Sequence, residues 1–248
     1  MKKALTLVVA LGVVAFTPLG AASAARSVRT TSPASIAGLS ARQIATLSLA
    51  NARAAGSCTN VSHGAAVGLS FSATTHSSAH VAEQAIDFNK SHGTALLIGA
   101  TAYVRMSAEL IDLEFGRTAP QLANKWISIA RTDKAFAGVT TGMLFSSMLD
   151  QVLPSGTLSK SKIITFDGVK VIALNGGANE RLGLNAAKQT LFVAARAPYL
   201  PVALDAAGRS QGVPTTLTVT FSQWGESLHY RAPVSSLPWR STSLAAGG

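Results

Sequence analysis

The stretch KIITFDGVKVIAL, residues 162–174, decides the fold class of this chain. At its centre, Asp167-Gly168 is a dipeptide that favours a tight hairpin turn, because its backbone twist matches that of paired strands. Apolar residues dominate on both sides of the turn, at 162–166 and 169–174. The stretch therefore predicts an antiparallel β-hairpin, and with it a protein built around a sheet.

Further strands are predicted on both sides of this hairpin. Val67, Leu69 and Phe71 alternate with small polar residues at 67–72, which is the two-residue period of a strand with one buried face. Comparable patterns predict strands at 80–88, 94–98, 102–106, 125–130, 189–195, 200–204, 215–222 and 228–232. No internal repeat or long linker divides the chain, so we expect one domain.

Helices are predicted over four segments, 41–55, 107–115, 119–124 and 136–153. Ser40 is placed to cap the start of the first helix, and Gly56 is placed to end it. The last segment has the strongest helical pattern, because its apolar residues recur at three- and four-residue spacing. The residues that carry this pattern are Phe145, Met148, Leu149 and Val152. The expected class is α+β, with a few helices packed on one face of a mostly antiparallel sheet.

The N-terminus has the composition of a secretory signal peptide. Two lysines precede an uncharged stretch of suitable length, and a small-residue cleavage pattern ends at Ala24. A retained membrane anchor is the alternative, but the apolar stretch is short for one. We therefore expect residues 1–24 to be removed and the protein to act in the cell envelope or outside the cell. A flexible segment at 25–38, a folded domain at 39–234 and a tail at 235–248 are expected to follow.

The single cysteine, Cys58, limits two further properties. A lipid anchor needs a cysteine at the cleavage point, and Cys58 lies far beyond it, so a product without a lipid anchor is expected. One cysteine cannot form an internal disulfide, so the fold does not depend on one. Cys58 itself is either a small buried apolar residue or a free thiol open to a partner.

The chain is basic, with a formal net charge of +10. Such a balance indicates either an anionic partner, such as a membrane or cell-wall surface, or simply a solubilising surface charge. The basic residues are scattered and are not interleaved with aromatic residues, as a nucleic-acid surface would require. Nucleic acid is therefore not expected as a partner.

No recognised catalytic or metal-binding motif stands in the sequence. Ser159 to Lys162 fits the S-x-x-K string of penicillin-interacting enzymes, but it leads into a strand and lacks the companion motifs. His76 and His80 are four residues apart, a spacing that suits a metal on a helix but not on the strand predicted here. We therefore predict no catalytic residue, no metal site, no cofactor and no enzyme activity.

Several segments, in this order along residues 40–234, resemble the LolA/LolB-like superfamily and its actinobacterial LppX/LprA/LprF/LprG lipoprotein branch. They are AGS (55–57), AYVR (102–105), KWISI (125–129), FDGVKV (166–171), LFV (191–193), YLPV (199–202), FSQWGE (221–226) and AP (232–233). The resemblance implies a curved antiparallel half-barrel sheet with helices packed on its concave face. It also implies that acyl chains are held between sheet and helices, and it carries no catalytic residues.

Two functions follow as hypotheses. The first is an envelope carrier that holds a lipidic or acylated ligand in an apolar cavity, lined by Phe145, Met148, Leu149 and Val152. The second is an interaction or sensor module of the same fold, with a filled concavity and no transported ligand. The identity of the ligand, the protein partner and the oligomeric state are not predicted.

Overall fold

A computed structural model describes residues 35–89, 91–116 and 118–245. Within them a single twelve-stranded sheet has the order β12-β6-β5-β4-β3-β2-β1-β11-β10-β9-β8-β7. The strands are β1 (Ser57–Ala66), β2 (Leu69–Ser78), β3 (Val81–Phe88), β4 (Ser91–Ile98), β5 (Thr101–Met106), β6 (Ile127–Ala130), β7 (Ser155–Phe166), β8 (Val169–Gly177), β9 (Asn185–Ala194), β10 (Pro201–Ser210), β11 (Val213–Ser222) and β12 (Leu237–Pro238).

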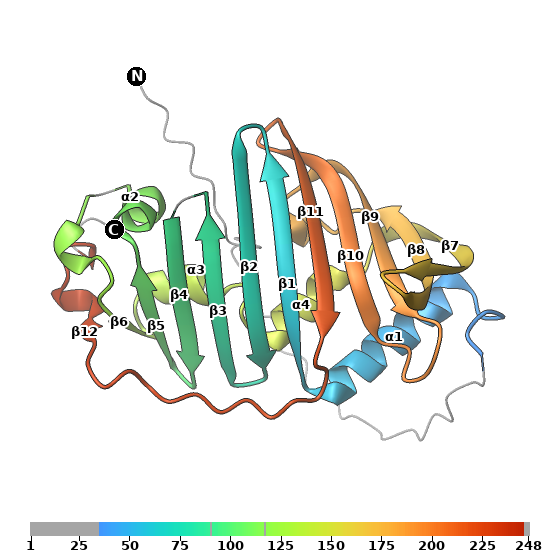
Figure 1. The fold of residues 1–248 in the computed structure, drawn as a ribbon, viewed down its shortest axis with the longest axis horizontal. Helices are drawn as coiled ribbons and strands as arrows, with labels where there is room; N and C mark the ends of the chain where they lie inside the picture. Colours follow the sequence, from blue (N-terminus) through green and yellow to red (C-terminus); the bar gives the residue numbers. More distant parts are fainter. Residues whose placement is uncertain (1–34, 90, 117, 246–248) are drawn as a thin grey trace.

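The sheet is open and curved, and helices cover one of its faces (Figure 1). The α-helices are α1 (Ala41–Ala55), α2 (Ala108–Phe115), α3 (Ala135–Thr140) and α4 (Phe145–Val152). Short 3₁₀ turns occur at η1 (Pro120–Leu122), η2 (Glu180–Leu182) and η3 (Trp239–Ser241). The fold class predicted from the sequence is confirmed: an antiparallel sheet carries its helices on the concave face.

The hairpin predicted from Asp167-Gly168 is present between β7 and β8. Asp167 and Gly168 have φ values of 45° and 78°, the left-handed geometry that a two-residue hairpin turn requires. The register pairs Phe166 with Val169 next to the turn. The strand β7 begins at Ser155, seven residues before the predicted stretch at 162, and register shifts interrupt its pairing with β8.

The helix α1 has the bounds that the sequence predicts. Ser40 Oγ accepts a hydrogen bond from the Gln43 backbone N–H at 3.3 Å, and Gln43 Oε1 accepts one from the Ser40 N–H at 2.9 Å. These two bonds form a capping box, which satisfies donors that the first turn of a helix leaves free. Gly56, at φ 77°, ends the helix in the left-handed conformation.

The concave face is divided into two apolar clusters. The first, which we call the α1/α4 half, joins α1 and α4 to the concave side of β1 and β8–β11. The second, the α2/α3 half, joins α2 and α3 to β3–β6. A small third cluster lies on the opposite face, where the Phe166 and Phe192 rings stack at 4.3 Å.

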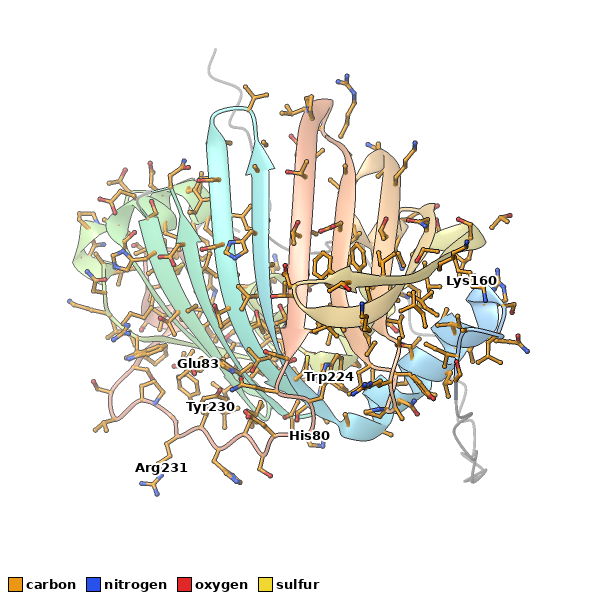
Figure 2. The ribbon with its side chains drawn as sticks, turned by 45° about the vertical axis from the view of Figure 1, so that its right-hand side comes forward. His80, Glu83, Lys160, Trp224, Tyr230 and Arg231 are labelled. Atoms are coloured by element: carbon orange, nitrogen blue, oxygen red, sulfur yellow. The ribbon has the colours of Figure 1, made fainter. Side chains whose placement is uncertain are left out.

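A long C-terminal segment crosses the molecule between β11 and β12. It runs along one end of the sheet to the far edge, where Leu237 and Pro238 pair in parallel with β6 (Figure 1). Every other pairing of the described strands is antiparallel. Tyr230 in this segment lies by Glu83 of β3, to which it is hydrogen-bonded (Figure 2). Burial and the Glu83 carboxylate raise the pKa of Tyr230 to about 12.

Four predicted elements differ from the structure. The helix predicted over 119–124 is only the 3₁₀ turn η1, at Pro120–Leu122. The helix predicted over 136–153 is two helices, because α3 ends at Thr140 and α4 starts at Phe145. The strand predicted over 67–72 is wrong in its bounds, since Val67 and Gly68 form the turn between β1 and β2. Residues 228–232 lie in the C-terminal segment and form no strand.

The core includes residues on both sides of the predicted 39–234 domain. Ile36 is fully buried in the α1/α4 half, and Trp239 is buried in the α2/α3 half. The Phe115 ring packs against Trp239 at 5.3 Å. The predicted signal peptide, residues 1–24, lies outside the described residues.

Candidate functional site

The four apolar residues predicted to line a cavity lie on α4, between α1 and the sheet. Phe145, Met148, Leu149 and Val152 are all buried, with between 1% and 8% of their surface exposed. Met148 and Val152 line a small cavity against the sheet. The Phe145 and Trp224 rings pack edge to face, with their centroids 6.2 Å apart. Leu149 lines a groove on the other side of the helix. Their contact with a ligand stays a prediction.

A larger apolar cavity of about 80 Å³ lies in the α2/α3 half. Its floor is the concave side of β3–β5, and α2 and α3 cover it. The cavity exists because two residues of the sheet are small: Gly93 and Ala95 fill little of the volume beneath the helices. Gly93 also lets α2 approach closely, since a Cβ there would lie 2.7 Å from the Leu110 Cδ2 atom. The apolar part of the lining is Ile86, Ala95, Val104, Met106, Leu110, Leu113, Phe115 and Val139.

The smaller cavity, of about 30 Å³, lies beside α4 and contains a polar group of side chains. Gln84 Nε2 donates to Thr75 Oγ1 at 3.0 Å, and Asn60 of β1 lines the same space. Asn60 and Thr75 are 6% and 2% exposed, so their amide and hydroxyl are almost entirely removed from solvent. No ionisable side chain lines this cavity within the described residues. It can therefore accept an uncharged polar group more readily than a charged one.

The linings of the two cavities adjoin at the break between α3 and α4. Thr141 lines the larger cavity, Gly142 lines the smaller one, and Gln84 of β3 lines both. Gly142 has φ 84°, which stops the helix from continuing. The Thr140 and Thr141 hydroxyls donate back to the carbonyl oxygens of Phe136 and Ala137, at 2.9 and 2.5 Å. Sequence reasoning missed this break because the apolar spacing continues across it.

Glu114 is the one acidic residue on the lining of the larger cavity. It lies at the rim, near Leu113 and Phe115 of α2. The apolar groups around its carboxyl disfavour the charged form and raise the pKa of Glu114. Apart from Glu114, no ionisable side chain lines this cavity within the described residues, which suits an apolar ligand.

A separate surface groove of about 450 Å³ lies between α1, α4 and η2, and its lining mixes apolar with charged side chains. Asp150 forms ion pairs with two arginines, at 3.9 Å to Arg53 Nη2 and 2.5 Å to Arg181 Nη1. These side chains are between 41% and 56% exposed, so the pairs contribute little to stability. Because four ionisable side chains line it (Arg53, Asp150, Glu180 and Arg181), this groove is a poor site for an apolar ligand.

Cys58 lies in the α1/α4 half as a buried free thiol. Burial raises the pKa of Cys58 to about 12, so the thiol stays protonated and unreactive near neutral pH. The first of the two alternatives for Cys58, a small buried residue, is confirmed. Across the part of the chain that the structure describes, no three His, Cys, Asp or Glu side chains gather in a way that could hold a metal ion.

The comparisons with known proteins concern the fold. No protein-family model and no curated protein sequence matches the chain. Among solved structures, the lipoprotein LppX of Mycobacterium tuberculosis is similar, with a TM-score of 0.51 and 14% identity over 76% of this chain and 97% of LppX. LprF from Mycobacterium bovis gives a TM-score of 0.51 and 14% identity, over 79% of this chain and 97% of LprF.

This chain has the LppX fold. The likeness confirms the resemblance drawn from the sequence, at the level of the fold, and it covers nearly all of both neighbours. Among the described residues, none of the helices has the length and apolarity needed to cross a membrane.

Proposed function

We propose that this protein is an exported binding protein that holds the acyl chain of a lipidic ligand between the sheet and the α3–α4 segment. The observation that carries the proposal is the pair of cavities on the concave face, whose linings adjoin at the α3–α4 break. The LppX-like fold agrees with the resemblance drawn from the sequence, and that resemblance implies that acyl chains are held between sheet and helices.

The ligand must displace part of the helical cover. The cavities measure about 80 and 30 Å³, whereas pockets for small-molecule ligands usually exceed roughly 300 Å³. Movement of residues 138–142 away from Gln84 would join the two spaces into one channel along the sheet. Binding of an acyl chain therefore requires the α3–α4 segment to move.

The α3–α4 segment is suited to such a movement. Neither α3 nor α4 has a side-chain hydrogen bond at its N-cap, whereas α1 and α2 are capped by Ser40 and Ser107. Both helices are short, with six and eight residues, and isolated helices of that length are unstable in water. Their position therefore depends on packing against the sheet, which an apolar ligand can replace.

The chemistry of the lining favours an apolar chain with an uncharged polar group. Each methylene buried in the larger cavity contributes about 0.8 kcal/mol to binding. The Asn60, Thr75 and Gln84 side chains offer hydrogen-bond donors and acceptors without a formal charge. A charged head group would have to lie outside, since burying it unpaired is costly.

A matched pair of tryptophan variants tests the proposal. Ala95→Trp places an indole in the larger cavity, and Ala85→Trp makes the same exchange on the neighbouring strand at an exposed position. We expect the wild type and Ala85→Trp to raise the fluorescence of an acyl-chain probe, and Ala95→Trp to lose at least tenfold in affinity. Equal binding by both variants, or none by the wild type, would contradict the proposal.

The small cavity volumes favour one alternative: a protein-interaction module of the same fold without a transported ligand. Native mass spectrometry of protein purified from its own host separates the two. Co-purified lipid supports carriage. Bare polypeptide that also fails to bind added acyl chains supports the interaction module.

A further inference from the structure

The tip of the β7–β8 hairpin, residues 162–170, has an exposed apolar surface. Ile163, Ile164 and Val169 expose 47%, 40% and 41% of their surface. Ile163 and Ile164 are consecutive on one strand, so they point to opposite faces of the hairpin. Apolar side chains are therefore exposed on both faces of the hairpin tip. Figure 2 shows this hairpin in front of β9 and β10, on the outside of the molecule.

Basic side chains surround the apolar tip. Lys162 and Lys170 are exposed within it, and Asp167 is its one acidic residue. The Ala195 backbone N–H donates to the Lys170 carbonyl at 2.8 Å, which brings the exposed Arg196 next to the tip. The combination is an apolar surface with a net positive border.

Lys160 does not belong to this border. Its Nζ donates to the Ala37 and Leu39 carbonyl oxygens, at 2.6 and 2.5 Å, and so joins β7 to the chain that precedes α1. Figure 2 places Lys160 beside α1, away from the hairpin turn. Its ammonium group is therefore already engaged in hydrogen bonds within the protein.

The free edge of β7 is protected against pairing with another strand. Register shifts occur between Ser155 and Ser159 and between Lys160 and Ile163. At the second shift, Ser161 Oγ replaces a backbone partner by accepting a hydrogen bond from Ala173 N–H at 3.0 Å. Such irregularities, together with edge lysines, are the usual means by which sheets avoid adding strands. A partner strand is thus a poor occupant for this surface.

We propose that the hairpin tip docks the protein on an anionic lipid bilayer. The apolar side chains of Ile163, Ile164 and Val169 enter the interface between head groups and acyl chains, and Lys162, Lys170 and Arg196 contact the acidic head groups. The inference rests on the proposed function in one respect, since a carrier of acyl chains must meet a bilayer to exchange them. Its physical basis is the charge and exposure of the tip.

Sedimentation with lipid vesicles tests the docking. The purified protein should bind vesicles of mixed phosphatidylglycerol and phosphatidylcholine, bind pure phosphatidylcholine much more weakly, and dissociate as salt is added. Each basic residue near an anionic bilayer strengthens binding about fivefold, so Lys162→Gln with Lys170→Gln should weaken it about 25-fold. Ile164→Ser with Val169→Ser should weaken it as well.

Two control substitutions remove the same residue types at the opposite end of the sheet. Lys188 faces Gly177 across the far end of β8, and Val67 is 77% exposed in the β1–β2 turn. Lys188→Gln and Val67→Ser should leave vesicle binding unchanged. Equal effects of control and tip variants would overturn the proposal, because binding would then follow net charge or hydrophobicity alone. Tip variants that alter the mass in light scattering, but not vesicle binding, would also overturn it in favour of a protein partner.

The docking and the proposed function can fail separately. The tip variants should still take up a soluble acyl-chain probe, because the tip lies apart from both cavities. Ala95→Trp should lose the probe and still bind vesicles. Loss of vesicle binding in Ala95→Trp would contradict the docking by the tip.

Discussion

The two halves of the concave face are packed in different ways. On β8–β11 the α1/α4 half presents large residues to its helices, among them Leu174, Leu191 and Phe221, and it is covered by the fifteen-residue helix α1. On β3–β5 the α2/α3 half mixes the small residues Ala82, Ala95 and Ala102 with larger ones, beneath helices of eight and six residues.

This difference separates stability from adaptability within one sheet. Large buried side chains beneath the fifteen-residue helix α1 make the α1/α4 half the main source of folding free energy. Small residues under short helices leave empty volume in the α2/α3 half, and empty volume forfeits the packing contacts that hold a helix in place. The half that supplies most of the folding free energy is therefore distinct from the half that contains the larger of the two cavities.

The largest effect expected is on the reactivity of Cys58, which reports on the α1/α4 half. Its pKa is raised to about 12 from 9.0, so its thiolate should be about a thousand times rarer than that of a free cysteine. Labelling by a thiol reagent should be slower by at least this factor in the folded protein and become fast in urea. Fast labelling under native conditions would mean that this half opens readily, which would contradict the comparison.

Truncation of one leucine in each half should show unequal costs. Leu191 is fully buried, and Leu191→Ala should lower the free energy of unfolding by about 3–5 kcal/mol. Leu110→Ala, next to the existing cavity, should cost about 2 kcal/mol, because Leu110 has fewer partners to lose. Urea denaturation measures both. The comparison is wrong if Leu110→Ala is the more damaging of the two.

Enlarging an alanine in each half should have the reverse outcome. Ala206 lies in the filled half, so Ala206→Leu should cost about 1–3 kcal/mol through overpacking. Ala95 borders free space, so Ala95→Leu should change the free energy of unfolding by less than about 1 kcal/mol. Thermal unfolding of the two variants beside the wild type gives the result, and similar losses in both would show that the cavity is not accessible to an added side chain.

The capping of α1 should contribute a smaller amount. Ser40→Ala removes the hydroxyl that accepts from Gln43 N–H, and it should cost about 1 kcal/mol. Ser40→Asp is the control, since a carboxylate can accept the same bond and should keep most of the stability. Equal losses in both variants would mean that the cap does not stabilise this helix.

The smallest expected effect is the pH-dependent stabilisation by an ion pair just before α3. Arg240 Nε donates to Asp133 Oδ1 at 2.6 Å, and this bond lowers the pKa of Asp133. The pair therefore stabilises the fold above the ordinary Asp pKa of about 4, and this contribution is lost as the pH falls through the lowered value. Arg240→Met should be less stable than the wild type at neutral pH, and the difference should shrink in acid. A difference that does not depend on pH would assign the effect to packing.

Local signals made much of the fold predictable. Asp167-Gly168 specifies its turn within two residues, and Ser40 and Gly56 specify the ends of α1 through their own backbone and side-chain chemistry. The order of short segments also indicated the LppX-like fold, which the structural likeness confirms. Such features depend on neighbours in the sequence, which is why they can be read from it.

The errors arise where distant parts of the chain decide the outcome. Asn60 and Ser62 of β1 lie on the buried, concave side of the sheet. The usual alternation of apolar buried and polar exposed residues is therefore absent from β1. The break at Gly142 interrupts a helix whose apolar spacing continues on both sides. The cavities depend on which helices lie over Gly93 and Ala95, and no local pattern contains that information.

The return of the C-terminal segment to β6 affects how the chain can fold during synthesis. Leu237 and Pro238 cover the outer edge of β6. The second partner of β1 is β11, which is made about 150 residues after it. Both edges are therefore uncovered while most of the polypeptide is still being made, and uncovered strand edges invite aggregation. A nascent chain of this protein is therefore exposed to aggregation at the β6 edge until residues 237–238 have been made and can pair with β6.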